Sequence, residues 1–379
     1  MEEKLAWKEI NLSALLHNLR LIQAMIGSKT DVIAVVKADA YGHGVKVVSR
    51  FLQKFGVKKF AVAYVDEGIE LREIGIEGDV IILSPQLKDA IPYLFEYNLT
   101  PVVSDIDFLR ELGKYSQRKE RNIKFHLGID TGMGREGLVP PFNIEEIKNA
   151  LINFKTLHLE AITSHLSSPE DKEDPYNLFQ KRIFEEVRLR FREEKDIFSH
   201  LLNTGGIFNF SDFHYQGVRP GISLYGYGNE KLQPVMEVKA RVTLVKELPS
   251  NWGIGYGHTF ITEFPTRIAL IPIGYADGYR RELSNKGRVL IKGKYHRVLG
   301  RISMDQFTVD INDEEVQVGD IVIVMGEDSE NKIDAQWIAT VCSTIPYEIL
   351  TGFGSSKRLK NFYKFEGKIL KDPIGELNL

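Results

Sequence analysis

The sequence has one cysteine, Cys342, among 379 residues. A single thiol excludes an internal disulfide and any metal site built from several cysteines. The apolar segment 338–342 around it is typical of a helix interior, so we expect a small buried thiol and not a nucleophile. The nine histidines form no HxH or HExxH motif, which argues against a metallohydrolase and predicts that the protein holds no metal.

Long hydrophobic runs and an excess of charge of one sign are also missing. No window approaches the roughly 18 apolar residues of a membrane-spanning helix, and no basic region precedes an apolar core near residue 1. With 49 Lys+Arg against 52 Asp+Glu, the formal net charge is -3, so no global field selects nucleic acid or an anionic membrane. We therefore expect a cytoplasmic protein whose partner is recognised locally.

Hydrophobic patterning divides the chain near residue 230, and its length suits two domains. A short strand is expected at 5–10, followed by a capped helix that begins at Ser13. Apolar, β-branched runs then alternate with helical patterns, which predicts a closed parallel (β/α)8 barrel over 1–230, with an open doubly wound sheet as the alternative. The eight runs lie near 32–37, 59–64, 79–83, 100–103, 122–129, 157–164, 199–203 and 217–224.

Residues 231–379 have a different texture, with long alternating runs and no helices between them. This indicates a mostly β second domain. A hairpin turn is expected at 292–294 and a helix over 335–345. The runs cover 235–248, 266–273, 288–298, 306–311 and 319–325.

The first apolar run leads directly into Lys37 and then into a turn of small residues. A lysine at the end of a buried strand loses hydration, which favours the free amine that can condense with a carbonyl. The simpler interpretation is that its stem covers apolar surface while the charge reaches water. Taken alone, the stretch favours the simpler interpretation, and the polar residues at the other strand ends reverse that preference.

Polar residues follow several other predicted strands, and in (β/α)8 barrels the C-terminal strand ends hold the active site. Two turns, 204–206 and 220–222, leave backbone N–H groups accessible where such barrels often hold a phosphate. A lysine, a phosphate cradle and an arginine at one rim predict pyridoxal 5′-phosphate as the cofactor. The strand-end residues are Asp130, Arg135, His165, Asn203, Thr204 and Arg219.

Seven ordered motifs resemble those of bacterial alanine racemases over essentially the whole chain. The resemblance implies racemisation of L- and D-alanine, which supplies D-alanine for peptidoglycan. It also implies a head-to-tail homodimer whose active sites draw on both chains, and first residues that pack with the C-terminal domain. The motifs are Ala-Val-Val-Lys-Ala-Asp-Ala-Tyr-Gly-His-Gly at 34–44, Asp-Thr-Gly-Met-Gly-Arg at 130–135, Ser-His at 164–165, Arg-Pro-Gly-Ile at 219–222, Gly-Tyr-Gly at 255–257, Gly-Tyr-Ala-Asp-Gly at 274–278 and Gly-Arg-Ile-Ser-Met-Asp-Gln at 300–306.

The same resemblance assigns roles to single residues. Lys37 would hold the cofactor covalently and act as the base on one face of the substrate, and Tyr256 of the second chain would be the base on the other face. Arg135 and Met304 match residues that meet the substrate carboxylate. The positions that match cofactor-binding residues, apart from Lys37, are Tyr41, His165, Asn203, Thr204, Arg219, Gly221, Ile222 and Tyr347.

Arg219 matches the residue that faces the pyridine nitrogen, and its chemistry can be argued from the side chain itself. A guanidinium is charged at physiological pH and only donates hydrogen bonds, so it leaves that nitrogen unprotonated. The ring is then a weaker electron sink, which suits proton exchange and disfavours transamination or elimination. His165 would join Arg219 and Tyr256 in a hydrogen-bonded chain that lowers the cost of ionising the tyrosine.

Three alternatives stay open at this point. A broad-specificity racemase of the same fold is the nearest, because discrimination between small side chains is worth only about 1–3 kcal/mol per methylene. A decarboxylase on the same domain plan would leave Tyr256 unexplained. A non-catalytic pyridoxal-phosphate carrier would leave residues 231–379, with Tyr256 and Met304, without a purpose.

Gly128 departs from the family pattern. This position lies two residues before the aspartate that matches Asp130. Many family members have a lysine here, and its carbamate forms an ion pair with the arginine that matches Arg135. A glycine supplies no anion, and a desolvated guanidinium needs a counter-charge. We therefore expect a bound anion such as chloride, a set of waters or another acidic residue in its place.

Overall fold

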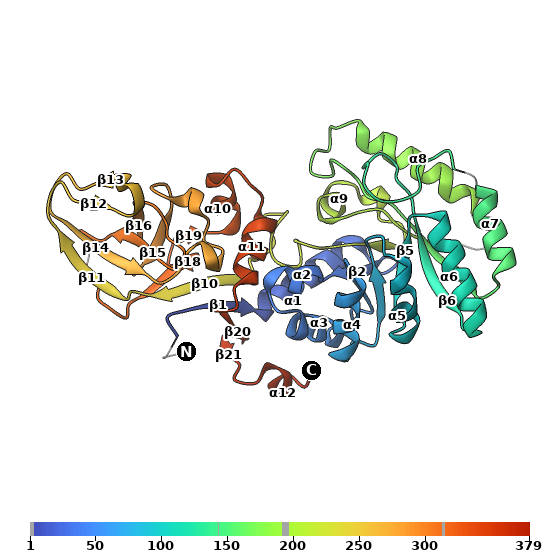
Figure 1. Ribbon diagram of the computed structural model, residues 1–379, viewed down its shortest axis with the longest axis horizontal. Coiled ribbons are helices and arrows are strands. Elements are labelled where there is room, and N and C mark those ends of the chain that lie inside the picture. The colour runs from blue at the N-terminus through green and yellow to red at the C-terminus, as the bar shows by residue number, and fades with distance from the viewer. Residues whose placement is uncertain (1–3, 143, 192–196, 313–314) are drawn as a thin grey trace. The chain divides into compact units, whose positions relative to one another are not determined.

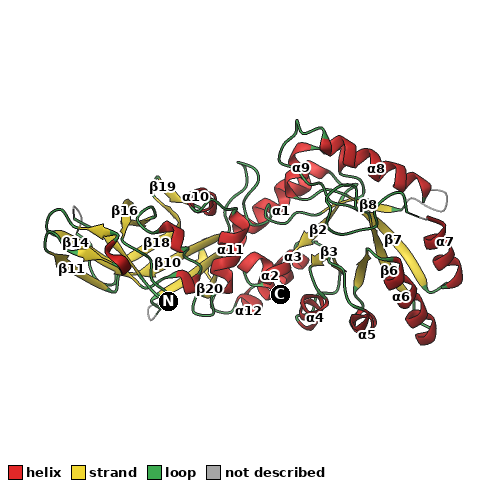
Figure 2. Ribbon diagram, turned by 45° about the horizontal axis from the view of Figure 1, so that its top comes forward, coloured by secondary structure: helices red, strands yellow, loops and turns green. Residues whose placement is uncertain are grey.

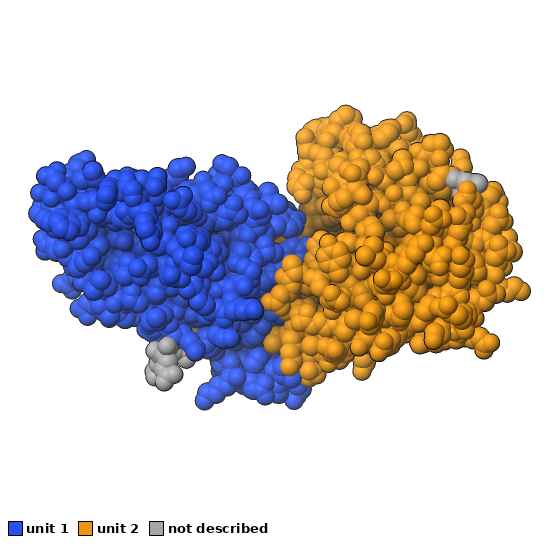
Figure 3. Space-filling model, in the orientation of Figure 1, with its two compact units in different colours: residues 1–15, 41–44, 225–378 blue, residues 16–40, 45–224, 379 orange. Residues whose placement is uncertain are grey.

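The computed structural model describes residues 4–142, 144–191, 197–312 and 315–379. Contacts divide the chain into two compact units, coloured separately in Figure 3. The barrel unit comprises residues 16–40, 45–224 and 379, and the β unit comprises residues 1–15, 41–44 and 225–378. Within the described residues, no helix is both long enough and apolar enough to span a membrane.

The barrel unit is built on eight parallel strands that close into a barrel in sequence order. Closure is made by β9 on β2, where Asp31 pairs with Gly217 and Val32 with Val218. The predicted (β/α)8 fold is therefore confirmed, and this pairing excludes the open sheet. The strands are β2 (Asp31–Val35), β3 (Lys59–Val62), β4 (Asp79–Ile82), β5 (Thr100–Val103), β6 (Ile123–Gly128), β7 (Leu157–Thr163), β8 (Phe198–His200) and β9 (Gly217–Val218).

Helices flank these strands on the outside (Figures 1 and 2), so the strands are apolar on both faces. In α3 (Val45–Lys54), Val48, Phe51 and Leu52 follow helical spacing and are fully buried. The larger helices here are α1 (Leu12–Ile26), α3 (Val45–Lys54), α4 (Val65–Glu73), α5 (Ile91–Glu96), α6 (Ile106–Lys119), α7 (Ile144–Asn153), α8 (Tyr176–Arg190) and α9 (Thr204–Asn209).

The first helix begins one residue earlier than expected, and Ser13 does not cap it. Asn11 Oδ1 accepts hydrogen bonds from the backbone N–H groups of Ser13 and Ala14, both at 3.1 Å. Because the preceding strand, β1 (Ala6–Asn11), runs directly into the helix, its last residue becomes the cap.

The β unit contains an 11-stranded sheet in the order β11-β14-β17-β16-β15-β18-β10-β1-β20-β21, with β19 paired to β18. The first strand of the chain lies between β10 and β20. The other strands of this sheet are β10 (Met236–Arg241), β11 (Leu244–Leu248), β14 (Thr266–Ile271), β15 (Arg288–Ile291), β16 (Lys294–Leu299), β17 (Phe307–Asp310), β18 (Ile321–Asp328), β19 (Asn331–Ile333), β20 (Lys360–Phe365) and β21 (Lys368–Ile369). A separate hairpin pairs β12 (Gly253–Ile254) with β13 (Phe260–Ile261).

Sequence patterning identified this unit as β-rich but placed some boundaries wrongly. The run 235–248 is two strands, since Val242 and Thr243 hydrogen-bond to Asp320 and Leu270 and the chain changes partners there. The turn at Lys292 and Gly293 is confirmed, with φ of 51° and 77°. Helix α10 (Ala335–Val341) ends before the buried Cys342, and α11 (Pro346–Ser355) follows as a separate helix.

Candidate active site

Lys37 follows β2 and opens α2 (Lys37–Gly42), a short left-handed helix. Ala38, Asp39, Ala40 and Tyr41 have φ of 52°, 54°, 53° and 55°. For L-residues this conformation brings Cβ close to the next carbonyl oxygen and costs about 1–2 kcal/mol per residue. Four such residues in succession need strong external restraint.

The carboxylate of Glu67, from α4, supplies much of that restraint. Its Oε1 accepts a hydrogen bond from the N–H of Ala38 at 2.6 Å, and its Oε2 accepts from Ala63 at 2.7 Å and Tyr64 at 3.3 Å. Asp39 Oδ1 accepts from the N–H of Val45 at 2.7 Å. The turn is thus held at both ends, and Lys37 is fixed at the C-terminal end of its strand.

The Lys37 amine lies in a desolvated and cationic environment. Burial, and then the charges of Arg135 and Arg219, lower the pKa of Lys37 from its ordinary value of 10.5, while Glu136 and Glu67 oppose the shift. A lowered pKa enlarges the fraction of free amine at neutral pH. The side chain therefore has the property required of a nucleophilic amine.

Arg219 is buried in the barrel, with 5% of its surface exposed. Burial, and then Arg135, lower the pKa of Arg219 to about 10, so the guanidinium stays charged at neutral pH. Its nitrogens donate to acceptors on every side. Nη1 lies 3.0 Å from Thr163 Oγ1, 2.8 Å from the carbonyl oxygen of His200 and 2.6 Å from His200 Nδ1. Nη2 lies 2.6 Å from the carbonyl oxygen of Ser164, 2.8 Å from the carbonyl oxygen of Leu201 and 3.2 Å from His165 Nδ1.

A chain of hydrogen bonds leads from Arg219 into the barrel. Because a guanidinium only donates, His200 Nδ1 accepts from Arg219 Nη1. The Nε2–H of His200 therefore donates to His126 Nδ1 at 2.9 Å. His126 Nε2–H then donates to Glu160 at 3.2 Å. Burial keeps the pKa of both histidines low, so they are neutral. Although burial acts in the opposite direction, hydrogen bonds from His126 and Lys124 lower the pKa of Glu160 to about 2.

His165 lies at the end of β7 with both ring nitrogens near donors. Nδ1 is 3.2 Å from Arg219 Nη2, and Nε2 is 3.2 Å from Asn203 Nδ2. A neutral imidazole can accept only one of these bonds. Burial and the surrounding cations Arg219, Arg135 and Lys37 lower the pKa of His165 to about 3, so the ring is neutral.

Two buried hydroxyls meet, that of Thr204 at the start of α9 and that of Ser223 in the turn that follows β9. Asn203 caps α9 by accepting from the N–H of Gly206 at 3.3 Å. Thr204 Oγ1 accepts from the N–H groups of Gly221 and Ser223, both at 3.2 Å, and lies 3.1 Å from Ser223 Oγ. Hydroxyl and backbone donors of this kind suit a phosphate group.

Tyr41 and Tyr347 come together in the β unit, with ring centroids 5.9 Å apart. Tyr41 also stacks on Tyr225 at 4.8 Å. Burial raises the pKa of Tyr41, with a further contribution from Tyr347. The Tyr41 phenol is therefore a neutral donor at physiological pH.

Tyr256 and Met304 are exposed on the β unit, at 70% and 52% of their surfaces. Gly255 has φ of +71°, and a Cβ there would lie 2.9 Å from the backbone nitrogen of Arg301. This close approach sets the tyrosine loop beside the segment that leads to Met304, whose carbonyl accepts from the N–H of Ala276 at 3.1 Å.

The structure therefore distributes the predicted residues over both units. Sequence reasoning did not single out Glu67, Glu136, Ser223 or the His126–His200 pair, although a histidine inside an apolar strand is a usable signal. The barrel unit contains Lys37, Arg135, His165, Asn203, Thr204, Arg219, Gly221 and Ile222, and the β unit contains Tyr41, Tyr256, Met304 and Tyr347.

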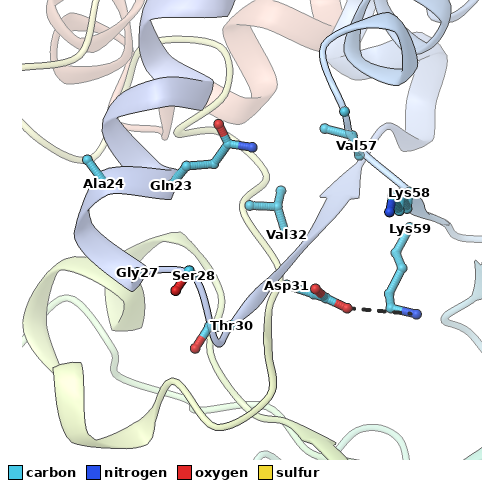
Figure 4. A pocket seen from close by; sticks show the side chains of 11 residues that line it. Gln23, Ala24, Gly27, Ser28, Thr30, Asp31, Val32, Val57, Lys58 and Lys59 are labelled. Atoms are coloured by element: carbon cyan, nitrogen blue, oxygen red, sulfur yellow. Dashed lines mark ion pairs between the residues drawn. The ribbon is translucent and has the colours of Figure 1, made fainter.

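A hollow of about 570 Å³ lies at the opposite end of the barrel strands (Figure 4). Asp31 and Lys59, the first residues of β2 and β3, line it, and the Lys59 amine is engaged by Asp79 at 2.8 Å and Asp31 at 3.9 Å. The N-terminal strand ends of such barrels serve stability and not catalysis. We therefore locate the candidate site at the Lys37 end.

Comparison with known proteins gives one consistent result. The model of the alanine racemase N-terminal domain matches residues 10–229, and that of the alanine racemase C-terminal domain matches residues 235–363. Alanine racemase 2 of Caldanaerobacter subterraneus subsp. tengcongensis is 38% identical over 371 residues, covering 95% of each chain.

Solved structures agree. The alanine racemase of Bacillus anthracis with bound L-Ala-P has a TM-score of 0.90 at 29% identity, covering 97% of each chain. That of Bartonella henselae with covalently bound pyridoxal phosphate has a TM-score of 0.87 at 32% identity, covering 95% of this chain and 99% of that one.

Proposed function

The chain belongs to the alanine racemase family, and from this premise we propose that it racemises alanine with pyridoxal 5′-phosphate and two bases. The observation that carries the proposal is the arrangement at the barrel mouth. A lysine with a lowered pKa, a buried arginine and a pair of hydroxyls all lie at C-terminal strand ends of one barrel.

The residues present fit the cofactor. When bound, pyridoxal 5′-phosphate supplies an aldehyde that condenses with amines and a ring that stabilises negative charge on the substrate. Lys37 would hold it covalently, and Arg219 would donate to the ring nitrogen. Because Thr204 Oγ1 already accepts two N–H groups, its hydrogen is directed at Ser223 Oγ, and the hydroxyl hydrogen of Ser223 would be the one donated to a phosphate oxygen. We assign Tyr41, Tyr347, Asn203, Gly221 and Ile222 to the same cofactor as part of this proposal.

Racemisation requires a proton to leave one face of the substrate and another to arrive on the opposite face. We propose Lys37 as the base on one face, because burial and neighbouring cations favour its free amine. Tyr256 of a second chain is proposed for the other face. The guanidinium of Arg219 is charged and can only donate hydrogen bonds, so it would leave the cofactor ring nitrogen unprotonated. This favours return of a proton to the substrate over side reactions.

A head-to-tail homodimer is part of the proposal. Tyr256 and Met304 are exposed, as is the apolar Trp252 at 53%. Trp252 also lines a hollow of about 230 Å³ with Leu248 and Ile254. An exposed apolar surface beside functional residues is typical of an interface. In the dimer, Tyr256 and Met304 of each chain would serve the site of the other.

We further propose that the enzyme works in the cytoplasm, that its D-alanine enters peptidoglycan, and that residues 1–230 and 231–379 are its two domains. Incubation of the protein and cofactor with L-alanine should yield D-alanine, detected with D-amino-acid oxidase. A panel of other amino acids tests the broad-specificity alternative, since faster turnover of another substrate would favour it. Release of carbon dioxide without D-alanine would favour a decarboxylase and refute the proposal.

A further inference from the structure

Three cationic side chains share the mouth of the barrel: Lys37, Arg135 and Arg219. Arg135 lowers the pKa of both others, so the three charges act on one another at short range. Two carboxylates oppose this effect at Lys37, those of Glu136 and Glu67. Glu67 is already committed, because its oxygens accept three backbone N–H groups.

Among the described residues, Glu136 is the carboxylate that forms an ion pair with Arg135. Its Oε1 lies 3.7 Å from Arg135 Nε, and the side chains are 28% and 52% exposed respectively. Glu136 also opposes the lowering of the pKa of Arg219. The Glu136 carboxylate therefore forms an ion pair with Arg135 and lies near enough to Lys37 and Arg219 to act on the charges of both.

The loop that carries this pair is held rigidly. Asp130 accepts from the N–H groups of Gly132 at 2.9 Å, Gly134 at 3.1 Å and Arg135 at 3.1 Å. Gly137, with φ of +107°, packs so closely that a Cβ would lie 2.5 Å from the Asp130 nitrogen. Arg135 and Glu136 thus extend from a fixed backbone, which keeps their side chains within reach of each other.

Gly128, at the end of β6, cannot supply this charge. A Cβ on Gly128 would lie 3.0 Å from Ser104 Oγ, 3.0 Å from Val102 Cγ1 and 3.3 Å from the carbonyl of Val103. A long side chain there would require these neighbours to move. The strand therefore presents bare backbone where an anion would otherwise be attached.

We propose that Glu136 is a positioning residue whose carboxylate orients the Arg135 guanidinium for the substrate carboxylate. This rests on the proposed function, because it assumes that Arg135 binds the carboxylate of alanine. Glu136 would then provide from the loop the negative charge that a carbamylated lysine provides from the strand in the family pattern.

A double-mutant cycle tests the inference. Glu136→Gln should raise KM for L-alanine about two- to five-fold, the range for a partly exposed ion pair, and change kcat less than twofold. In the Arg135→Gln background, Glu136→Gln should change KM no further. The matched control is Glu173→Gln, which removes an exposed carboxylate of the same unit and should leave KM unchanged.

A second measurement uses the apoprotein and needs no turnover. The rate of phenylglyoxal modification at Arg135, followed by peptide mass spectrometry, should rise about two- to five-fold in Glu136→Gln, because the paired carboxylate restricts access of the reagent to the guanidinium. An unchanged rate, or an equal KM increase in both backgrounds, would overturn the inference. If the wild type does not racemise alanine, the proposed function fails, while the modification rate still decides whether Glu136 pairs with Arg135.

Discussion

Replacing Glu67 by glutamine tests the restraint on the left-handed turn after Lys37. The substitution keeps the size of the side chain and removes its charge. Glutamine has one acceptor oxygen, so it can accept from the N–H of Ala38 or from the N–H groups of Ala63 and Tyr64, but not from both sets. Its NH2 group then lies against the remaining N–H donors. One side of the clamp must therefore open.

The expected loss follows from the contacts. A hydrogen bond to a charged group contributes about 1.5–3 kcal/mol, and an orphaned donor adds to its loss. Four left-handed residues carry about 4–8 kcal/mol of backbone strain at about 1–2 kcal/mol each. We expect Glu67→Gln to lower the free energy of unfolding by about 2–3 kcal/mol, which is large against the usual 5–15 kcal/mol but leaves the protein folded.

Urea denaturation of the apoprotein measures this change, with the cofactor dissociation constant as a second readout because Lys37 adjoins the turn. Glu70→Gln, in the same helix, is the control. Burial and the neighbouring carboxylates Asp39, Glu67 and Glu73 raise the pKa of Glu70, so its neutralisation should not destabilise the fold. If Glu67→Gln unfolds at the same urea concentration as the wild type, the clamp does not stabilise the turn and our account of it is wrong.

Four further predictions address the site. Lys37→Ala should remove both the yellow colour of the bound cofactor and racemisation, and an unchanged absorption spectrum would exclude Lys37 as the attachment point. Tyr256→Phe should nearly abolish turnover while the cofactor stays bound. Mixing Tyr256→Phe chains with Lys37→Ala chains should restore activity, because one of the two sites in each mixed dimer is intact. If mixing restores no activity, the shared-site model is refuted. Removal of carbon dioxide should leave activity unchanged, since Gly128 carries no carbamate, and a loss that bicarbonate reverses would contradict this. The pKa of Glu160 is lowered from 4.5 to about 2, so its ionised form stabilises the fold above pH 4.5 by at most about 3 kcal/mol, since solvent screens a partly exposed pair, and this contribution is lost as the pH falls toward 2. Glu160→Gln should flatten the acid dependence of the urea midpoint in that range, and an unaltered dependence would exclude Glu160 as its source.

The sequence predicted what depends on local pattern. Apolar runs at regular intervals gave the eight barrel strands, and Lys37, His165 and Arg219 were identified because each stands at or near a strand end. The hairpin at Lys292 and Gly293 was predicted for the same reason, since two residues suffice to define the turn.

Features that depend on distant contacts could not be predicted in this way. Ala38, Asp39, Ala40 and Tyr41 all prefer right-handed conformations, and the left-handed turn depends on the hydrogen bonds that Glu67 and Asp39 accept at its two ends. The short hairpin of β12 and β13 was missed because two-residue strands have no periodicity. His126 and His200 are far apart in sequence, and the pairing of β6, β7 and β8 in the barrel brings their rings into contact.

The pair of histidines inside the barrel has a consequence for observing this enzyme. His126 and His200 are 2% and 0% exposed, and each imidazole proton is engaged in a hydrogen bond whose direction Arg219 fixes. Protons sealed in this way exchange slowly with water and resonate apart from other signals in a nuclear magnetic resonance spectrum. The resonances of these two imidazole protons should therefore shift when the charge near Arg219 changes. They would report cofactor or substrate binding without any label on either molecule.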